Sequence, residues 1–225
     1  MAENISKLYR SGLWYNDTIE QRFKHVQKAL SDFCNDDYDD LDLAWHIKNA
    51  VIGGVYISER VFDGIKYNGF WNKYVTIDGN DQVQYINKET DQYAIIKDIV
   101  EGKAVINNGV FDDKYLEIRK WTRSYYSNAH LHFEHVIPAK VYIAELIRAY
   151  KAWQFDLPYF MDFRKNIRVC IVLKKEENED KLDQWRESMP QLQGKENLPL
   201  EQKWQLVLQR PFARYEETGV CIHGL

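Results

Sequence analysis

The feature that most constrains this chain is residues 128–140, NAHLHFEHVIPAK, which place histidines and a carboxylate within an apolar run. The segment holds three of the six histidines, and Glu134 directly precedes the last of them, His135. Pro138 closes the segment, and proline does not continue a central strand. The apolar and aromatic residues in between are typical of a short buried strand. The segment therefore predicts a strand that ends abruptly and presents an acid and an imidazole side by side.

Size and composition set the outer limits of the fold. With 225 residues and 45% hydrophobic residues, the chain can form one large domain or two small ones around a sizeable core. No run approaches the roughly 18 apolar residues of a membrane span, and the N-terminus has no apolar run of signal-peptide type. The widely spaced cysteines, Cys34, Cys170 and Cys221, indicate reduced thiols in a cytoplasmic protein. The net charge of −4 argues against indiscriminate nucleic-acid binding but allows a local basic face.

Two helices are expected near the N-terminus. The first follows Asp17 as N-cap, and its apolar residues recur at helical spacing: Ile19, Phe23, Val26, Leu30 and Phe33. The acidic run at residues 35–42 predicts a solvated loop that caps a second helix over residues 43–52, because aspartate is favoured at helix N-termini. Cation binding by these carboxylates is the alternative. Gly53 and Gly54 break or kink the second helix.

The middle of the chain predicts a hairpin and a basic helix. Residues 67–85 alternate aromatic and β-branched residues around an Asp-Gly turn, which indicates a β-hairpin. Residues 114–126 are expected to be helical, and Arg119, Lys120 and Arg123 share one face of that helix. This basic face is a candidate phosphate-contacting surface, and an ordinary solvated face is the alternative.

After Pro138 the pattern becomes helical and then alternates once more. An apolar stripe indicates the first helix: Tyr142, Ile143, Leu146, Ile147, Tyr150 and Trp153. Leu157 and Pro158 end it, and residues 167–173 read as a strand. A polar helix is expected over residues 176–187, and one more helix over residues 201–208. A boundary near residue 110 would separate a helical and hairpin recognition or scaffold region, 1–110, from a catalytic region, 111–225.

The order of elements over residues 131–187 is strand, Glu-His-Val-Ile-Pro, inserted helix, asparagine-led strand and polar helix. This order resembles the HNH nuclease family, whose catalytic unit is the ββα-metal fold. The resemblance implies that His135 is the general base and that Asn166 braces its loop. It also implies that Glu134 and Asn178, with Asp180 as the alternative to Asn178, hold one divalent metal. The glutamate before the histidine, the inserted helix and Asn178 in place of a more frequent histidine depart from the family pattern.

The chemistry of phosphodiester hydrolysis fits this residue set. A histidine that titrates near neutral pH can activate water, and a hard cation bound by oxygen ligands can relieve charge at the phosphate. A carboxylate and an amide suit Mg²⁺ or Mn²⁺. Basic residues that would neutralise flanking phosphates are Arg148, Lys165, Arg168 and Lys174.

The element pattern predicts an α+β protein with a mostly helical N-terminal region and a hairpin, followed, as the resemblance implies, by a C-terminal HNH-like unit with an inserted helix. By analogy its activity would be that of a restriction or defence endonuclease that cuts double-stranded DNA, with a homodimer as the form that cuts both strands.

Other function classes remain open at this stage. His130 and His132 lie at strand spacing with Glu134, so they would be extra ligands, phosphate contacts or hydrogen-bonded structural residues. The same pattern would suit a two-histidine, one-carboxylate Fe(II) enzyme, although that class requires many short strands. A non-catalytic interaction factor that binds another protein through acidic and aromatic surfaces is the third class. Motifs of nucleotide-binding proteins and serine hydrolases are absent from the sequence.

Overall fold

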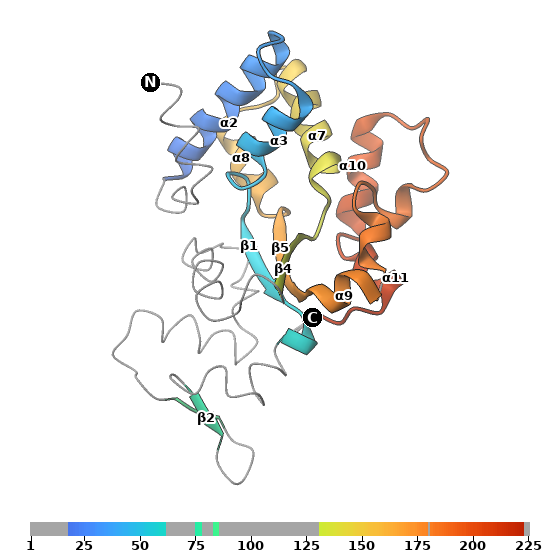
Figure 1. Ribbon diagram of the computed structural model, residues 1–225. Helices are drawn as coiled ribbons and strands as arrows, with labels where there is room; N and C mark the ends of the chain where they lie inside the picture. Colours follow the sequence, from blue (N-terminus) through green and yellow to red (C-terminus); the bar gives the residue numbers. More distant parts are fainter. Residues whose placement is uncertain (1–17, 62–74, 78–82, 86–130, 180, 223–225) are drawn as a thin grey trace. The chain divides into compact units, whose positions relative to one another are not determined.

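A computed structural model describes the following parts of the chain: residues 18–61, 75–77, 83–85, 131–179 and 181–222. They combine helices with short strands, which confirms the mixed α and β class (Figure 1). The chain divides into two compact units, and each takes residues from both sides of position 110. Unit 1 comprises residues 1–53, 135–168 and 185–217, and unit 2 comprises residues 54–134, 169–184 and 218–225. The expected boundary itself lies outside the described residues.

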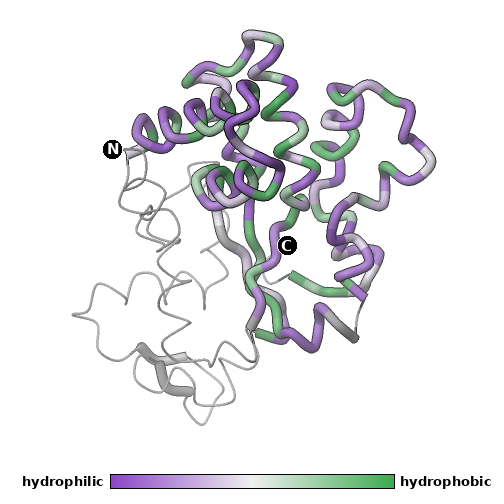
Figure 2. The backbone as a smooth tube through the Cα atoms, turned by 45° about the horizontal axis from the view of Figure 1, so that its top comes forward, coloured by the Kyte–Doolittle hydropathy of each residue, from purple (hydrophilic) through white to green (hydrophobic). Residues whose placement is uncertain are grey.

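Unit 1 is built mainly from amphipathic helices. They include α2 (Ile19–Cys34), α3 (Asp40–Ile47), α7 (Ala139–Lys151), α8 (Leu157–Arg164) and α10 (Leu200–Gln209). Helix α2 packs against α3, α7 and α8, and α7 packs against α10. Hydrophilic and hydrophobic residues alternate along their turns (Figure 2), as expected for helices that bury one face. The buried residues include Val26, Leu30, Ile47, Leu146 and Phe160.

The caps of the first two helices follow from the sequence. Thr18 caps α2 and forms a capping box with Gln21, so the helix begins one residue later than an Asp17 cap would place it. Asp39 caps α3 and accepts a hydrogen bond from the Asp42 backbone. The acidic run therefore caps a helix, as expected, although α3 begins and ends earlier than residues 43–52.

The chain requires a glycine at position 53, just after α3. A Cβ atom at this position would lie 2.1 Å from the Arg164 carbonyl oxygen, a distance that no side chain tolerates. The Gly53 amide donates to the Ile167 carbonyl at 2.7 Å, and the Arg164 guanidinium donates to the Ile52 carbonyl. The close approach joins the chain after α3 to the chain after α8.

The expected stripe on α7 is correct except at its end. Tyr142, Ile143 and Leu146 are buried, but Trp153 is 96% exposed. The expectation for Trp153 is wrong because α7 ends at Lys151 and Trp153 has a left-handed backbone, with φ of 57°. A residue beyond the helix end no longer follows the helical spacing.

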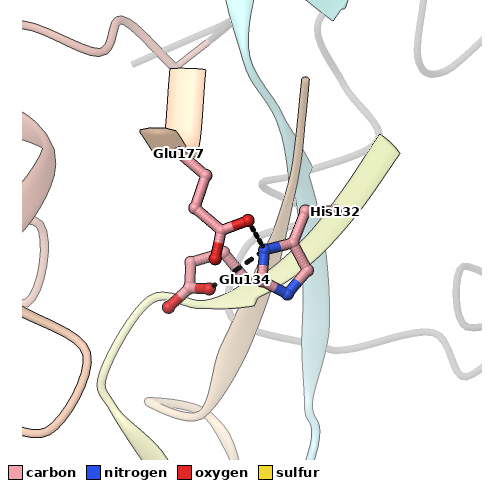
Figure 3. Close-up of side chains that lie close together, drawn as sticks. All are labelled: His132, Glu134 and Glu177. Atoms are coloured by element: carbon pink, nitrogen blue, oxygen red, sulfur yellow. Dashed lines mark ion pairs between the residues drawn. The ribbon is translucent and has the colours of Figure 1, made fainter. Parts of the chain in front are cut away.

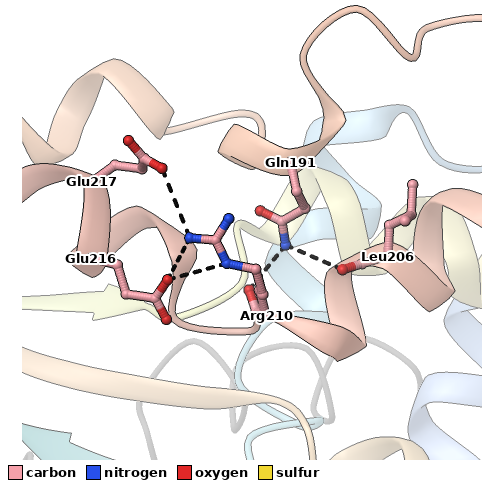
Figure 4. A network of polar contacts seen from close by, with 5 residues as sticks. All are labelled: Gln191, Leu206, Arg210, Glu216 and Glu217. Carbon is pink, nitrogen blue, oxygen red and sulfur yellow. Dashed lines mark hydrogen bonds and ion pairs between the residues drawn. The ribbon is translucent and has the colours of Figure 1, made fainter.

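Polar networks join the remaining elements of unit 1. Buried Glu145 accepts two hydrogen bonds from Arg148 and one from the Tyr159 hydroxyl. Burial and the Glu145 carboxylate raise the pKa of Tyr159, so the hydroxyl stays protonated and donates. Figure 4 shows a second network, in which Gln191 donates to the carbonyls of Leu206 and Arg210. Arg210 in turn pairs with Glu216 and Glu217 of α11 (Ala213–Thr218).

Unit 2 contains a small sheet with strand order β1-β5-β4 among the described residues. The strands are β1 (Gly54–Ile57), β4 (Leu131–His135) and β5 (Arg168–Leu173). Backbone bonds from Gly53 to Ile167 and from Ser58 to Ile171 run in the same order along both chains, so β1 and β5 are parallel. The end of β4 meets the start of β5, where Val136 donates to Arg168, as in an antiparallel pair. Both strands expected around the Glu-His segment are therefore present and adjacent.

The prediction of one polar helix over residues 176–187 is wrong in its bounds. Helix α9 (Lys174–Glu179) begins directly after β5, and a 3-10 turn, η3 (Leu182–Trp185), follows it. Lys181 between them has φ of 60°, a left-handed conformation that a continuous helix does not contain. Of the two apolar residues on this stretch, Leu182 is fully buried.

The expected hairpin is confirmed. Strands β2 (Val75–Ile77) and β3 (Val83–Tyr85) pair antiparallel, with Val75 opposite Tyr85. The helix expected at residues 114–126 lies outside the described residues. Within the described part of the chain, no helix has the length and apolar character needed to cross a bilayer.

The environment of His25 in α2 makes a stability prediction. Burial, reinforced by neighbouring His46, lowers the pKa of His25 from 6.5 to about 4, and its Nε2 donates to the His46 carbonyl. The His25 ring takes up a proton near pH 6.5 in the unfolded chain but only near pH 4 in the folded chain. The contribution of the neutral ring to the free energy of unfolding is therefore fully present above pH 6.5. It is lost as the pH falls through 4, and the loss should reach roughly 2 to 3 kcal/mol by pH 4.5.

Urea unfolding at pH 7 and pH 4.5 measures this loss. The variant His25→Gln keeps an amide donor for His46 but does not titrate, so its free energy of unfolding should change less between the two pH values. Equal changes in the variant and in the natural sequence would contradict the assignment.

Candidate metal centre

Three side chains of unit 2 converge on one point, two from β4 and one from α9. His132 and Glu134 are two residues apart in β4, and this spacing places both on the same face of the strand. Glu177 reaches them from α9 (Figure 3). The His132 Nδ1 atom lies 3.6 Å from Glu134 Oε2 and directly contacts Glu177 Oε2. One ligand atom from each residue lies within 4.8 Å of the others.

The local sequence explains how these elements meet. Four consecutive residues of β5 are buried, from Val169 to Val172, so this strand lies inside the sheet between β1 and β4. Helix α9 starts immediately after β5, and the chain from Lys174 to Glu179 is strongly polar. Acidic residues are favoured in the first turn of a helix, which is where Glu177 lies. The sheet order and the short strand-to-helix connection together bring Glu177 to β4.

The three side chains are largely withdrawn from water, and two of them are carboxylates. The side chains of Glu134 and Glu177 are 11% and 14% exposed, and that of His132 is 32% exposed. Carboxylates in such a position require a compensating charge or hydrogen bonds. A divalent cation would supply that charge at the point where the three side chains meet.

The donor set is chemically suited to a divalent metal ion. Two ligands of an ion with bonds of about 2.1 Å lie about 3 to 4 Å apart, close to the spacing of this cluster. Carboxylate oxygens suit Mg²⁺ and Mn²⁺, while an imidazole nitrogen suits later transition metals. A set of one nitrogen donor and two carboxylates therefore favours Mn²⁺ over Mg²⁺. Three protein ligands also leave positions open for water and substrate.

Of the predicted metal ligands, Glu134 belongs to this cluster. Asn178 lies in α9, but its side chain is outside the described residues, as is all of Asp180. The other two residues of the cluster, which the sequence did not assign as ligands, are Glu177, the residue before Asn178, and His132. Two signals pointed to them: the spacing of His132 from Glu134, and the acidic start of the helix that follows the second strand.

His135, the predicted general base, points to the opposite face of the strand from Glu134, because neighbouring side chains in a strand alternate. Its Nε2 lies 3.2 Å from the Lys48 carbonyl oxygen, and its own carbonyl accepts a hydrogen bond from Arg214 at 2.7 Å. A carbonyl oxygen only accepts, so Nε2 must carry the proton of this contact. In the neutral ring the lone pair then resides on Nδ1, and the tautomer is fixed.

Asn166 lies just beyond α8 and outside the cluster. Its side-chain amide donates to the Asp162 carbonyl at 3.3 Å, and its backbone amide donates to Phe163. These bonds satisfy carbonyls at the end of α8, which is a common role for asparagine at a helix end. The bracing role expected for Asn166 therefore stays a prediction.

The predicted phosphate contacts have varied surroundings. Arg148 is held by Glu145 and Gln154, and its hydrogen bonds to Glu145 raise the pKa of the guanidinium. Lys165 is exposed and pairs with Asp162, and Arg168 donates to the Lys165 carbonyl. Lys174 is exposed at the start of α9. The basic face of Arg119, Lys120 and Arg123 lies outside the described residues, as does His130.

Comparison of the chain with protein-family models, curated proteins and solved structures finds no match.

Metal titration tests the centre directly. We expect the protein to bind one equivalent of Mn²⁺ in calorimetry, and bound metal to raise the melting temperature because it binds only the folded state. Removal of one ligand, in His132→Ala or Glu177→Gln, should weaken Mn²⁺ binding at least about tenfold.

The matched control for this titration is Glu201→Gln, which removes a carboxylate from the first turn of α10. Its Mn²⁺ affinity should equal that of the natural sequence. Equal affinity in Glu177→Gln would contradict the assignment of this ligand.

Proposed function

We propose that the protein is a divalent-metal-dependent phosphodiesterase that cleaves nucleic acid, with its metal bound by His132, Glu134 and Glu177. The observation that carries this proposal is the convergence of these three side chains from a strand and the helix after the neighbouring strand. The order of β4, inserted helices, β5 and α9 is the order that the HNH resemblance implies. The metal would polarise the scissile phosphate and stabilise the charge that develops on its oxygens.

We assign His135 as general base on the HNH resemblance alone. The Lys48 carbonyl accepts a hydrogen bond from Nε2 and thereby orients the ring. The Arg214 contact to the His135 carbonyl fixes the backbone from which the ring projects.

The substrate class follows from the resemblance and from the charges on this part of the chain. Lys165 and Arg168 flank the start of β5 and Lys174 follows its end, and such cations would contact phosphates beside the scissile bond. Double-stranded DNA as substrate, a restriction or defence role, cytoplasmic location and a homodimer that cuts both strands are parts of the same proposal, and they rest on analogy.

A second candidate function is that of a non-catalytic factor that binds another protein. On α3 the large apolar residues Leu41 and Trp45 are 72% and 50% exposed, one helical turn apart, next to the acidic loop. Such a surface suits a basic partner. Failure of the purified protein to cleave any DNA or RNA with Mg²⁺ or Mn²⁺ would favour this function over the nuclease.

Cleavage assays separate the roles of the metal and the base. With supercoiled DNA and Mn²⁺, we expect nicking or cutting that a chelator abolishes. His135→Ala should lower kcat at least about 100-fold, the usual scale of a lost general base, while Mn²⁺ affinity stays unchanged. Glu177→Gln should lose both activity and affinity.

The control is His25→Gln, which changes a histidine that the proposal does not use. It should cleave at the rate of the natural sequence at pH 7.5. Full activity in His135→Ala would remove this residue from the mechanism, whereas full activity in Glu177→Gln would remove the metal centre itself.

A further inference from the structure

Next to the metal ligand Glu177 lies a second glutamate, Glu176, which is only 1% exposed. Its Oε2 atom accepts two hydrogen bonds, one from the Ser58 hydroxyl at 2.6 Å and one from the Leu173 amide at 2.8 Å. A carboxylate is seldom buried this completely without a specific structural or functional reason. Glu176 therefore differs in role from the exposed acidic residues of the chain.

Ser58, the partner of Glu176, is fully buried and held on several sides. Its backbone amide donates to the Ile171 carbonyl at 3.0 Å, and its hydroxyl accepts from the Val61 amide at 3.2 Å. It also forms an isolated antiparallel bridge with Ile222. These contacts hold Ser58 against β1 and β5. Its hydroxyl group is therefore fixed in the orientation that donates to Glu176.

The two bonds fix the start of α9. Leu173 is the last residue of β5 and Lys174 the first of the helix, so Glu176 reaches back to the residue before the helix. This is half of a capping box, in which the third helical residue accepts from the N-cap amide. Leucine offers no side chain to complete such a box, and the Ser58 hydroxyl is an additional contact to the same carboxylate.

Helix α9 needs this anchor because it has only six residues. Helices of that length are not stable in isolation, so contacts outside the helix must fix its rotation and position. Glu177 follows Glu176 directly, and its direction is set by the rotation of the helix. A shift of the first turn would move the Glu177 carboxylate away from His132.

We propose that Glu176 and Ser58 are a positioning pair that aligns Glu177 with His132 for metal binding. The inference rests on the proposed function, because the pair acts through the ligand Glu177 and not on the substrate. Residues that orient metal ligands typically contribute a factor of 10 to 100 to metal affinity. The pair would thus set the affinity of the centre without contacting the metal.

The experiment measures Mn²⁺ affinity by calorimetry in the full chain. Ser58→Ala removes the hydroxyl, and Glu176→Gln keeps an acceptor oxygen but removes the charge that strengthens both hydrogen bonds. Each variant should bind Mn²⁺ about 10 to 100 times more weakly, although all three ligands are present. Ser58→Thr retains the hydroxyl and should restore affinity to within about threefold of the natural sequence.

A matched control separates positioning from a general loss of stability. Tyr159→Phe removes a hydroxyl that donates to buried Glu145 in unit 1, so it costs a similar hydrogen bond elsewhere in the chain. Its melting temperature should fall as in Ser58→Ala, but its Mn²⁺ affinity should not change. An equal loss of affinity in Tyr159→Phe would show that the effect is merely structural and would overturn the proposal.

A second readout does not depend on metal. In the metal-free protein, the Nδ1 chemical shift of His132 reports its contact with Glu177, and Ser58→Ala should shift it. If the natural sequence binds Mn²⁺ and both variants bind it equally well, the positioning role is wrong and the proposed function stands. If the natural sequence binds no Mn²⁺, the proposed function fails and the positioning role fails with it.

Discussion

One electrostatic constraint governs the candidate metal centre: two glutamates and one histidine share a space with little access to water. Glu134 and Glu177 repel each other there, and the imidazole of His132 contacts both carboxylates. A divalent cation resolves this conflict better than a proton does, because it brings two positive charges and accepts all three side chains as ligands. We therefore propose that the cluster is a metal-binding site and not only an ion pair.

The surrounding structure holds these three groups in place. Two of them come from one strand, where the alternation of side chains fixes their common face. The third comes from a short helix that begins where β5 ends and that Glu176 ties to β1 and β5 through Ser58 and Leu173. His135 is held differently, by the Lys48 carbonyl at its ring and by Arg214 at its backbone.

The sequence predicted much of the local structure because its signals are local. The strand before Pro138, the apolar strand that starts near Ile167 and the paired strands β2 and β3 all appear where the patterns place them. The predicted ends of helices were less accurate where the backbone conformation of a single residue ends the helix. Trp153 and Lys181 adopt left-handed conformations that end helical segments, and nothing in their residue types indicates this.

The candidate site was predictable in part. The Glu-His pair singled out Glu134. Which residue of α9 faces Glu134, however, depends on the rotation of that helix about its own axis. Sequence alone does not give that rotation within one residue, so it did not single out Glu177 beside the predicted Asn178. The contact of Glu176 with Ser58 joins residues 118 positions apart, and no local pattern could have indicated it.

Pulsed electron paramagnetic resonance of bound Mn²⁺ tests the central claim most directly. In protein labelled with ¹⁵N-histidine, the account predicts coupling of the ion to one directly bound imidazole nitrogen, and loss of this coupling in His132→Gln. Bound Mn²⁺ without any nitrogen coupling, or coupling that persists in His132→Gln, would contradict the assignment of the metal centre to His132, Glu134 and Glu177.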